Sequence, residues 1–177
     1  NVFASVDAMP AITLRTRFSF NLSQGSFRGF TPTTPENSEP GTVNGINENN
    51  GRGTAWTFTN TATYTKSTPR HNISLLLGHE ANSSTSYFAT GQISNLLNDD
   101  PANRYIDDGL GAPGTKNVSS TGTFDRLLSF FGKADYNYAG KYYVGVTVRR
   151  DGSSKSPKGN QWGTFPAFNV GWRASRE

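Results

Sequence analysis

The 177-residue sequence contains no cysteine and few charged residues. The absence of cysteine excludes a disulfide framework, a thiolate zinc site and an iron–sulfur site. Charged residues make up 17% of the chain, against the usual quarter. Seventeen basic and 13 acidic residues leave a formal net charge of +4. This small and scattered excess does not indicate nucleic-acid binding, so no nucleic-acid partner is expected.

Long apolar runs are also absent. The chain has no stretch of about 18 apolar residues, which excludes a transmembrane helix. It has no basic-then-apolar start, so any signal peptide is expected to lie outside these residues. Aromatic residues, in contrast, reach 12%, and glycine occurs 19 times. Together with many Ser, Thr and Asn residues, this composition indicates an all-β protein that is either secreted or placed in an outer membrane.

Apolar and polar residues alternate with a period of two, which is the signal of a strand with one apolar and one polar face. The alternation is clear from Ile12 to Leu22 and from Trp56 to Tyr64, and clearest in the C-terminal third. No segment shows a convincing helical period. Seven antiparallel strands are predicted, at residues 2–8, 12–22, 54–65, 72–80, 124–138, 142–151 and 165–175.

The predicted connections alternate between short and long. Short turns fall at residues 9–11, 67–71 and 139–141, whereas long loops are predicted at about 23–53 and 81–122. This alternation is typical of an outer-membrane barrel, and strands of about 9–11 residues suit a tilted membrane crossing. The predicted fold is therefore an all-β, antiparallel up-and-down meander that forms part of a large transmembrane β-barrel. The alternative is a soluble β-sandwich with a lectin-like, carbohydrate-binding function.

The two faces of the strands differ in chemistry. Large apolar residues are predicted to point toward lipid, namely Leu14, Phe18, Phe20, Phe130, Tyr136, Val144, Val146, Val170 and Trp172. The opposite face, predicted to line a hydrated lumen, carries Arg15, Arg17, Lys133, Asp135, Thr147 and Arg149. Charges in mid-strand favour the barrel over the sandwich. Aromatic residues at the strand ends are candidates for interfacial girdles, namely Trp56, Tyr64, Tyr138, Tyr142 and Trp172.

Several C-terminal segments resemble one family in order and spacing. They are Leu127–Tyr138, Lys141–Tyr143, Val148–Ser154, Trp162–Pro166 and Gly171–Glu177. This series resembles the barrel of SusC/RagA-type TonB-linked outer-membrane transporters, and residues 54–64 and 71–78 are similar to the preceding hairpin. The resemblance implies that residues 1–177 are a middle segment of that barrel, without the plug domain and the rest of the barrel wall.

The resemblance also implies a function. Members of this family import nutrients through the outer membrane of Gram-negative bacteria. A SusD-like surface lipoprotein captures the oligosaccharide or peptide substrate, and the TonB complex acts through the plug and N-terminal part. In this chain the residues would form barrel wall and loops in contact with lipid and perform no covalent chemistry. The protein is therefore expected to be a transporter and not an enzyme. An outer-membrane β-barrel enzyme is a further alternative.

Individual motifs give weaker signals. Arg149–Ser154 is a family signature that we interpret as turn chemistry, because Asp-Gly follows a strand. Asp99, Asp100, Asp107 and Asp108 carry the carboxylates that calcium prefers, but their spacing fits no EF-hand. His71 and His79 would lie roughly 26 Å apart on one strand, too far to share a metal.

The remaining candidates define no catalytic site. Gly25–Phe30 resembles a phosphate-binding loop only in composition. Aromatic residues placed in loops are candidates to stack on sugars or peptides, namely Phe27, Phe30, Tyr87, Phe88, Tyr105 and Trp162. No catalytic, metal-binding or cofactor-binding residue is predicted, no cofactor is expected, and the substrate-binding residues stay open. Because lipid offers no partner for open sheet edges, the outer strands are predicted to pair with the remainder of the same barrel.

Overall fold

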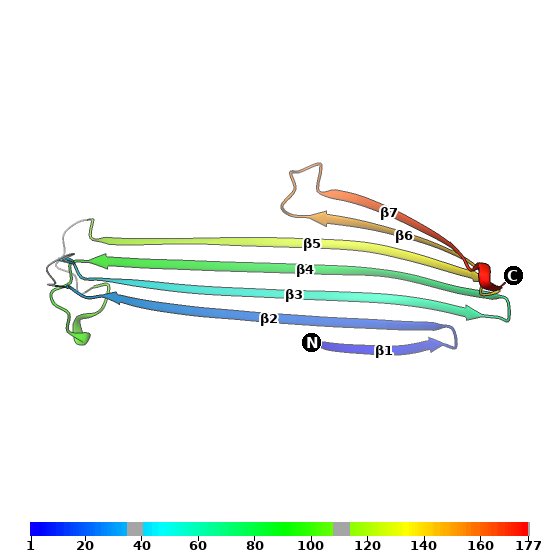
Figure 1. Ribbon diagram of the computed structural model, residues 1–177, viewed down its shortest axis with the longest axis horizontal. Helices are drawn as coiled ribbons and strands as arrows, with labels where there is room; N and C mark the ends of the chain where they lie inside the picture. The colour runs from blue at the N-terminus through cyan, green and yellow to red at the C-terminus, as the bar shows by residue number, and fades with distance from the viewer. Residues whose placement is uncertain (35–40, 108–113, 177) are drawn as a thin grey trace. The chain divides into compact units, whose positions relative to one another are not determined.

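The computed structural model describes residues 1–34, 41–107 and 114–176. Seven strands form one antiparallel sheet in the order β1 to β7, each beside its neighbour in sequence (Figure 1). Two single-turn 3₁₀ helices, η1 (Pro101–Asn103) and η2 (Ala174–Arg176), accompany them. The strands are β1 (Val2–Met9), β2 (Ile12–Thr31), β3 (Gly45–Ser67), β4 (His71–Ser94), β5 (Lys116–Tyr138), β6 (Tyr142–Ser153) and β7 (Trp162–Trp172). The predicted meander is confirmed, and the sandwich alternative is wrong because all seven strands belong to one sheet.

The residues divide into two compact units. Unit 1 contains residues 1–21, 55–84 and 124–177, and unit 2 contains residues 22–54 and 85–123. Strands β2 to β5 contribute residues to both units, whereas β1, β6 and β7 belong to unit 1. The described residues contain no helix with the length and hydrophobicity of a membrane span.

The long loops predicted at 23–53 and 81–122 are wrong in extent. Strands β2 to β5 are 20, 23, 24 and 23 residues long, and they occupy most of both ranges. Over much of these extensions both faces carry polar residues, as in Asn47, Glu48 and Asn49 of β3. A strand with two polar faces leaves no period-two signal, although its backbone ladder is the same. Within the two predicted loop ranges, the connections that remain are residues 32–44 and 95–115.

Two glycines fix the geometry at the ends of β6. At its start, Ala139 and Gly140 both have positive φ, as a two-residue hairpin turn requires, and Asn137 accepts a hydrogen bond from the Gly140 amide at 2.9 Å. At its other end, Gly152 stays in the strand opposite Trp162. A Cβ at Gly152 would lie 2.9 Å from the Trp162 ring. The interpretation of Asp151-Gly152 as a turn is therefore wrong: the glycine makes room for an indole.

Buried apolar side chains are rare in this sheet. Within the described ranges, only Ile46, Ile93 and Leu96 are buried, all in unit 2, where Phe30 and Ile106 pack against them. In unit 1 many large apolar side chains are exposed, and none of those described is buried. A sheet that exposes its apolar face needs a partner for that face other than its own core.

Candidate functional site: a two-faced wall and an amide pocket

One face of the unit 1 sheet is apolar and exposed. The strand register places Val144 opposite Val170 and Val146 opposite Phe168 on β6 and β7. Val170 and Phe168 are 75% and 85% exposed, far more than apolar side chains of a soluble sheet. All nine residues predicted to point toward lipid are exposed in this way. Their alternation on paired strands gathers them on one face, as predicted.

Aromatic rings line the ends of this apolar face. Tyr138 stacks on Tyr142 beside the short turn, with ring centroids 6.5 Å apart. At the start of β7, Trp162 stacks on Phe130 of β5 at 6.2 Å, and the Arg150 guanidinium lies 5.2 Å from the Trp162 ring. Trp162 was expected in a loop, but it begins β7. Paired aromatic bands of this kind are typical of barrels that cross membranes.

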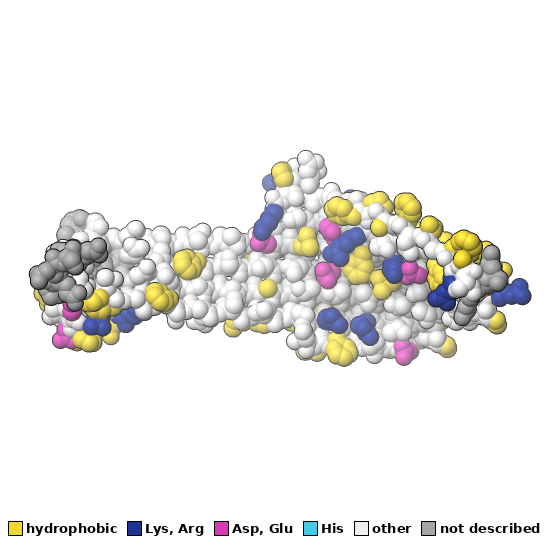
Figure 2. Space-filling model, viewed as in Figure 1, with side chains coloured by type: hydrophobic (Ala, Val, Ile, Leu, Met, Phe, Trp, Pro, Cys, Tyr) yellow, Lys and Arg dark blue, Asp and Glu magenta, His cyan; other side chains and the backbone are white. Residues whose placement is uncertain are grey.

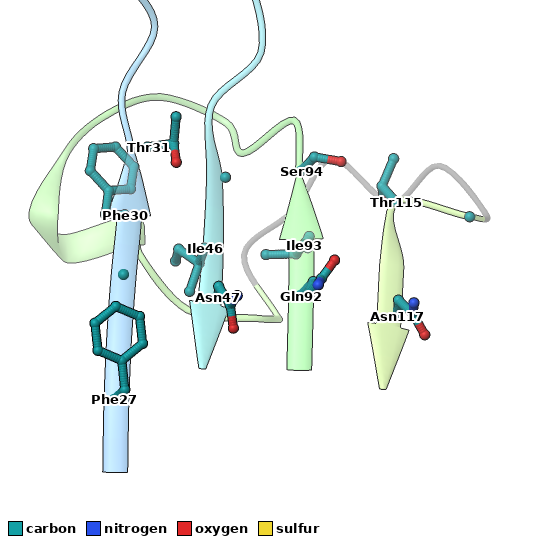
Figure 3. A pocket seen from close by; sticks show the side chains of 13 residues that line it. Phe27, Phe30, Thr31, Ile46, Asn47, Gln92, Ile93, Ser94, Thr115 and Asn117 are labelled. Carbon is teal, nitrogen blue, oxygen red and sulfur yellow. The ribbon is translucent and has the colours of Figure 1, made fainter. Parts of the chain in front are cut away.

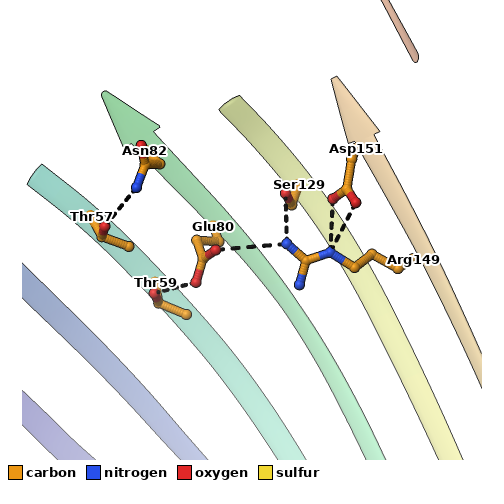
Figure 4. Close-up of polar contacts among 7 residues, drawn as sticks. All are labelled: Thr57, Thr59, Glu80, Asn82, Ser129, Arg149 and Asp151. Carbon is orange, nitrogen blue, oxygen red and sulfur yellow. Dashed lines mark hydrogen bonds and ion pairs between the residues drawn. The ribbon is translucent and has the colours of Figure 1, made fainter. Parts of the chain in front are cut away.

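The opposite face of unit 1 carries a charged network centred on Arg149. Its Nε donates to both carboxylate oxygens of Asp151, at 2.8 and 3.1 Å. Its Nη2 donates to the hydroxyl of Ser129 at 3.0 Å and lies 3.7 Å from Glu80 Oε1 (Figure 4). Thr59 donates to the other oxygen of Glu80 at 3.1 Å. The network ties β3, β4, β5 and β6 together.

The ion pairs on this polar face are partly exposed to solvent. The charged side chains of the network are 25% to 40% exposed, so each ion pair is only modestly stabilising. Lys133 and Asp135 form a second pair at 2.8 Å. Figure 2 shows basic and acidic side chains interspersed over the unit 1 strands. Such a face is suited to contact with water.

A polar pair interrupts the apolar face of unit 1. Asn60 interrupts the apolar alternation of β3, and His79 does the same on β4. The structure pairs them, with 3.0 Å between Asn60 Nδ2 and His79 Nε2, and Phe58 and Phe130 flank the imidazole. His71 lies at the start of the same strand and contacts the Tyr136 hydroxyl at 2.8 Å. The two histidines are thus engaged separately.

In unit 2, Asp99 holds the connection between β4 and β5. Its carboxylate accepts hydrogen bonds from Thr33 N and Oγ1 at 3.1 and 2.9 Å, and from Asn44 Nδ2 at 2.8 Å. The buried Asn44 also accepts from the Leu96 amide at 2.6 Å. Hydrogen bonds from Asn44 and Thr33 hold the pKa of Asp99 below its ordinary value of 3.8.

The other acidic candidates have structural partners as well. Asp100 caps η1 by accepting from the Ala102 amide, and Asp107 pairs with Lys116 at 3.1 Å. Asp108 lies outside the described residues. No group of three or more His, Asp or Glu side chains with metal-binding geometry occurs within residues 1–34, 41–107 and 114–176.

A pocket of about 560 Å³ opens on unit 2. Three carboxamide side chains, Asn47 of β3, Gln92 of β4 and Asn117 of β5, line it, and Phe27 of β2 stands beside them (Figure 3). We call this site the amide pocket. Because Ile46 and Ile93 are buried by Leu96, strand alternation turns Asn47 and Gln92 to the other face of the sheet. Sequence analysis missed the pocket because Asn47, Gln92 and Asn117 fall in segments predicted as loops.

The predicted loop aromatics have mostly strand positions. Phe27 and Phe30 belong to β2, and Tyr87 and Phe88 belong to β4, so their placement in loops was wrong. Phe30 is covered by the Arg104 guanidinium at 3.8 Å, and Tyr105 is covered by Arg28 at 4.7 Å. Of these rings, Phe27 is the one that lines the amide pocket with its face uncovered by an arginine. Gly25–Phe30 is a strand and not a phosphate-binding loop.

Comparisons with known proteins agree on one family. No family model matches the chain. TonB-dependent receptor P3 of Formosa agariphila is 30% identical over 178 residues, covering 100% of this chain and 17% of the receptor. TonB-dependent receptor P39 of the same organism is 28% identical over 99% of this chain. TonB-dependent receptor SusC of Bacteroides thetaiotaomicron is 42% identical over 55 residues, or 31% of this chain. The chain spans about 17% of the length of the first two relatives.

Solved structures show the same fold. The match with the RagAB peptide transporter covers 95% of this chain and 18% of that protein's chain. It has a TM-score of 0.83 and a sequence identity of 22%. The RagAB importer in its open-open state gives a TM-score of 0.85 at 21% identity. The two-faced meander is thus a segment of a large β-barrel wall. The chain belongs to the TonB-dependent receptors of the SusC/RagA type.

Proposed function

We propose that this chain is a wall segment of an outer-membrane, TonB-dependent nutrient importer in a Gram-negative bacterium. The observation that carries the proposal is the exposed apolar face of unit 1, opposite a charged and hydrated face. A barrel wall between lipid and a water-filled lumen needs this arrangement. The relatives named TonB-dependent receptors support the import function.

Strand length supports a position for unit 2. Strands β2 to β5 have 20 to 24 residues, about twice the 9–11 that a bilayer crossing needs. We place the polar unit 2 residues outside the hydrocarbon, on the extracellular side, since long connections occupy that side in outer-membrane barrels. The same proposal assigns the free edges of β1 and β7 to pairing with the remainder of the barrel, since lipid offers them no hydrogen bonds.

The proposed import cycle involves partners beyond this chain. A SusD-like lipoprotein presents an oligosaccharide or peptide, and the TonB complex acts through the plug and N-terminal part. The residues described here enclose and contact the cargo and take no part in covalent chemistry. The fold shared with the RagAB peptide transporter supports an importer of this class.

Fractionation of cells that express the full-length protein tests the proposal. The protein is expected in the outer-membrane fraction, to require detergent for extraction, and to copurify with a surface lipoprotein. Uptake of its cargo should stop when the proton gradient that drives TonB is collapsed. Recovery of the full-length protein in the soluble fraction would overturn the proposal.

A further inference from the structure

We infer that the outer end of the apolar face of unit 1 binds a phosphate-bearing lipid headgroup, with Arg126 and Arg150 as its counter-charges. The inference rests on the proposed function, in which this face contacts the outer membrane, and it assigns one part of the face to one class of lipid. Three observations carry it: the depth of the aromatic bands, two guanidinium groups without an acidic partner, and a pocket between two indoles.

The aromatic bands define the depth of this site. Tyr142 begins β6 next to a short turn, and Trp162 of β7 lies opposite Gly152, near the other end of β6. The ten residues from Tyr142 to Gly152, at about 3.3 Å each on a strand tilted by about 35–45°, rise roughly 25 Å. This equals the height of the apolar band in outer-membrane barrels. Because short turns lie on the periplasmic side, Trp162 belongs to the outer boundary.

Two arginines lie at this outer boundary, at positions that continue the apolar alternation of β5 and β6. The Arg150 guanidinium lies 5.2 Å from the Trp162 ring, and the Arg126 guanidinium lies 4.5 Å from the Phe124 ring. Both side chains are exposed, and neither guanidinium forms a hydrogen bond or an ion pair with another described residue. Each therefore offers its N–H donors to an oxyanion.

The apolar face supplies no counter-charge of its own. Strand alternation places every acidic residue of the described unit 1 strands on the polar face, namely Asp7, Glu80, Asp125, Asp135 and Asp151. An anion for Arg126 and Arg150 therefore comes from outside these strands. Guanidinium groups match phosphate through two parallel hydrogen bonds, and at this depth of a membrane the phosphates are those of lipid headgroups.

A pocket beside the guanidinium groups favours a lipid over a free phosphate ion. It has a volume of about 390 Å³, its exposed surface is mostly apolar, and its lining includes Trp56, Ala81, Arg126, Leu128, Gly152 and Trp162. The two indoles come from β3 and β7, and the small Ala81 and Gly152 come from strands between them. An apolar pocket that continues the apolar face suits the part of a lipid where its chains join the headgroup, whereas a free phosphate would leave it empty.

Native mass spectrometry of the full-length protein in a neutral detergent tests the inference. The probes are lipid A, lipid A with its phosphates removed, and inorganic phosphate alone. Wild type is expected to bind phosphorylated lipid A about tenfold more tightly than the dephosphorylated form, and not to bind inorganic phosphate. The double variant Arg126→Gln/Arg150→Gln should lose this preference. Arg173→Gln removes a guanidinium that lies 6.0 Å from the Tyr143 ring, near the other boundary, and should bind as wild type does.

Three results would refute the headgroup site: equal binding of the two lipid forms by wild type, binding of inorganic phosphate as tight as that of the lipid, or wild-type preference in the double variant. The first two need no variant, and heat-modifiable migration on gels verifies that each variant barrel is folded. Failure here is separable from failure of the proposed function. A protein that fractionates with the outer membrane but ignores the lipid phosphates refutes the headgroup site alone, whereas a protein in the soluble fraction refutes the transporter.

Discussion

Strand β3 passes through both units and has a different composition in each. Its unit 1 part alternates Trp56, Phe58, Ala62 and Tyr64 with threonines, whereas Gly45–Thr54 in unit 2 contains a single large apolar residue, Ile46. The backbone is an extended, paired strand throughout. Side-chain alternation therefore reports what each face contacts, and it does not report whether a strand is present.

The largest expected change in the free energy of unfolding comes from a charge placed on the apolar face of unit 1. Val146→Arg places a charge on the apolar face and should cost about 2–4 kcal/mol near the middle of the membrane. Thr147→Arg, one residue away on the polar face, should cost less than about 1 kcal/mol, the remaining penalty coming from Lys133 opposite it. Unfolding of the full-length protein in lipid vesicles measures both. Equal costs would contradict the assignment of the two faces.

In unit 2 the corresponding weak point is a group of hydrogen bonds that we call the polar clasp. In it, Asn44 bonds to Asp99 and to the Leu96 amide, and Thr33 bonds to Asp99. Asn44→Ala removes the bonds to Asp99 and to the Leu96 amide, which should cost about 2 kcal/mol locally. Hydrogen exchange of residues 95–107 should accelerate by about 30-fold, the factor that corresponds to that free energy. Asn50→Ala, an exposed carboxamide of the same strand region, serves as the control. Unchanged exchange in Asn44→Ala would show that the connection is held by other contacts.

The charged network of unit 1 should contribute less. A double-mutant cycle of Arg149→Ala and Asp151→Ala is expected to give a coupling free energy of about 0.5–1 kcal/mol, because both side chains are partly exposed. Unfolding in vesicles provides the four stabilities. A coupling near zero would mean that the network positions β6 without stabilising it.

The smallest effect concerns pH. The pKa of Asp99 is lowered in the folded state, so the ionised carboxylate stabilises the clasp above its ordinary pKa of 3.8. This contribution is lost as the pH falls through the lower, folded-state pKa. Hydrogen exchange of residues 95–107, corrected for intrinsic rates, should therefore rise at acid pH in wild type and stay flat in Asp99→Asn. Identical profiles would exclude Asp99 as the titrating group.

The sequence predicts those strands that have one apolar and one polar face. An apolar face is indicated by the alternation that includes Leu14, Phe18, Val144 and Val146. A hairpin is indicated by the short Ala139-Gly140 turn. Gly152 misled, because its role depends on Trp162, ten residues away in sequence and opposite it in the sheet. The amide pocket escaped because polar strands carry no periodic signal, and because Asn47, Gln92 and Asn117 meet only through strand pairing.

The central claim is that one face of the unit 1 sheet contacts lipid and the other contacts water. The segment has no cysteine of its own, so single cysteines can be introduced along β6 at residues 143–148 in the full-length protein and spin-labelled. Labels at Val144, Val146 and Val148 should be accessible to oxygen dissolved in the bilayer. Those at Tyr143, Gly145 and Thr147 should be accessible to a water-soluble nickel complex. Accessibility that does not alternate with a period of two would contradict the account.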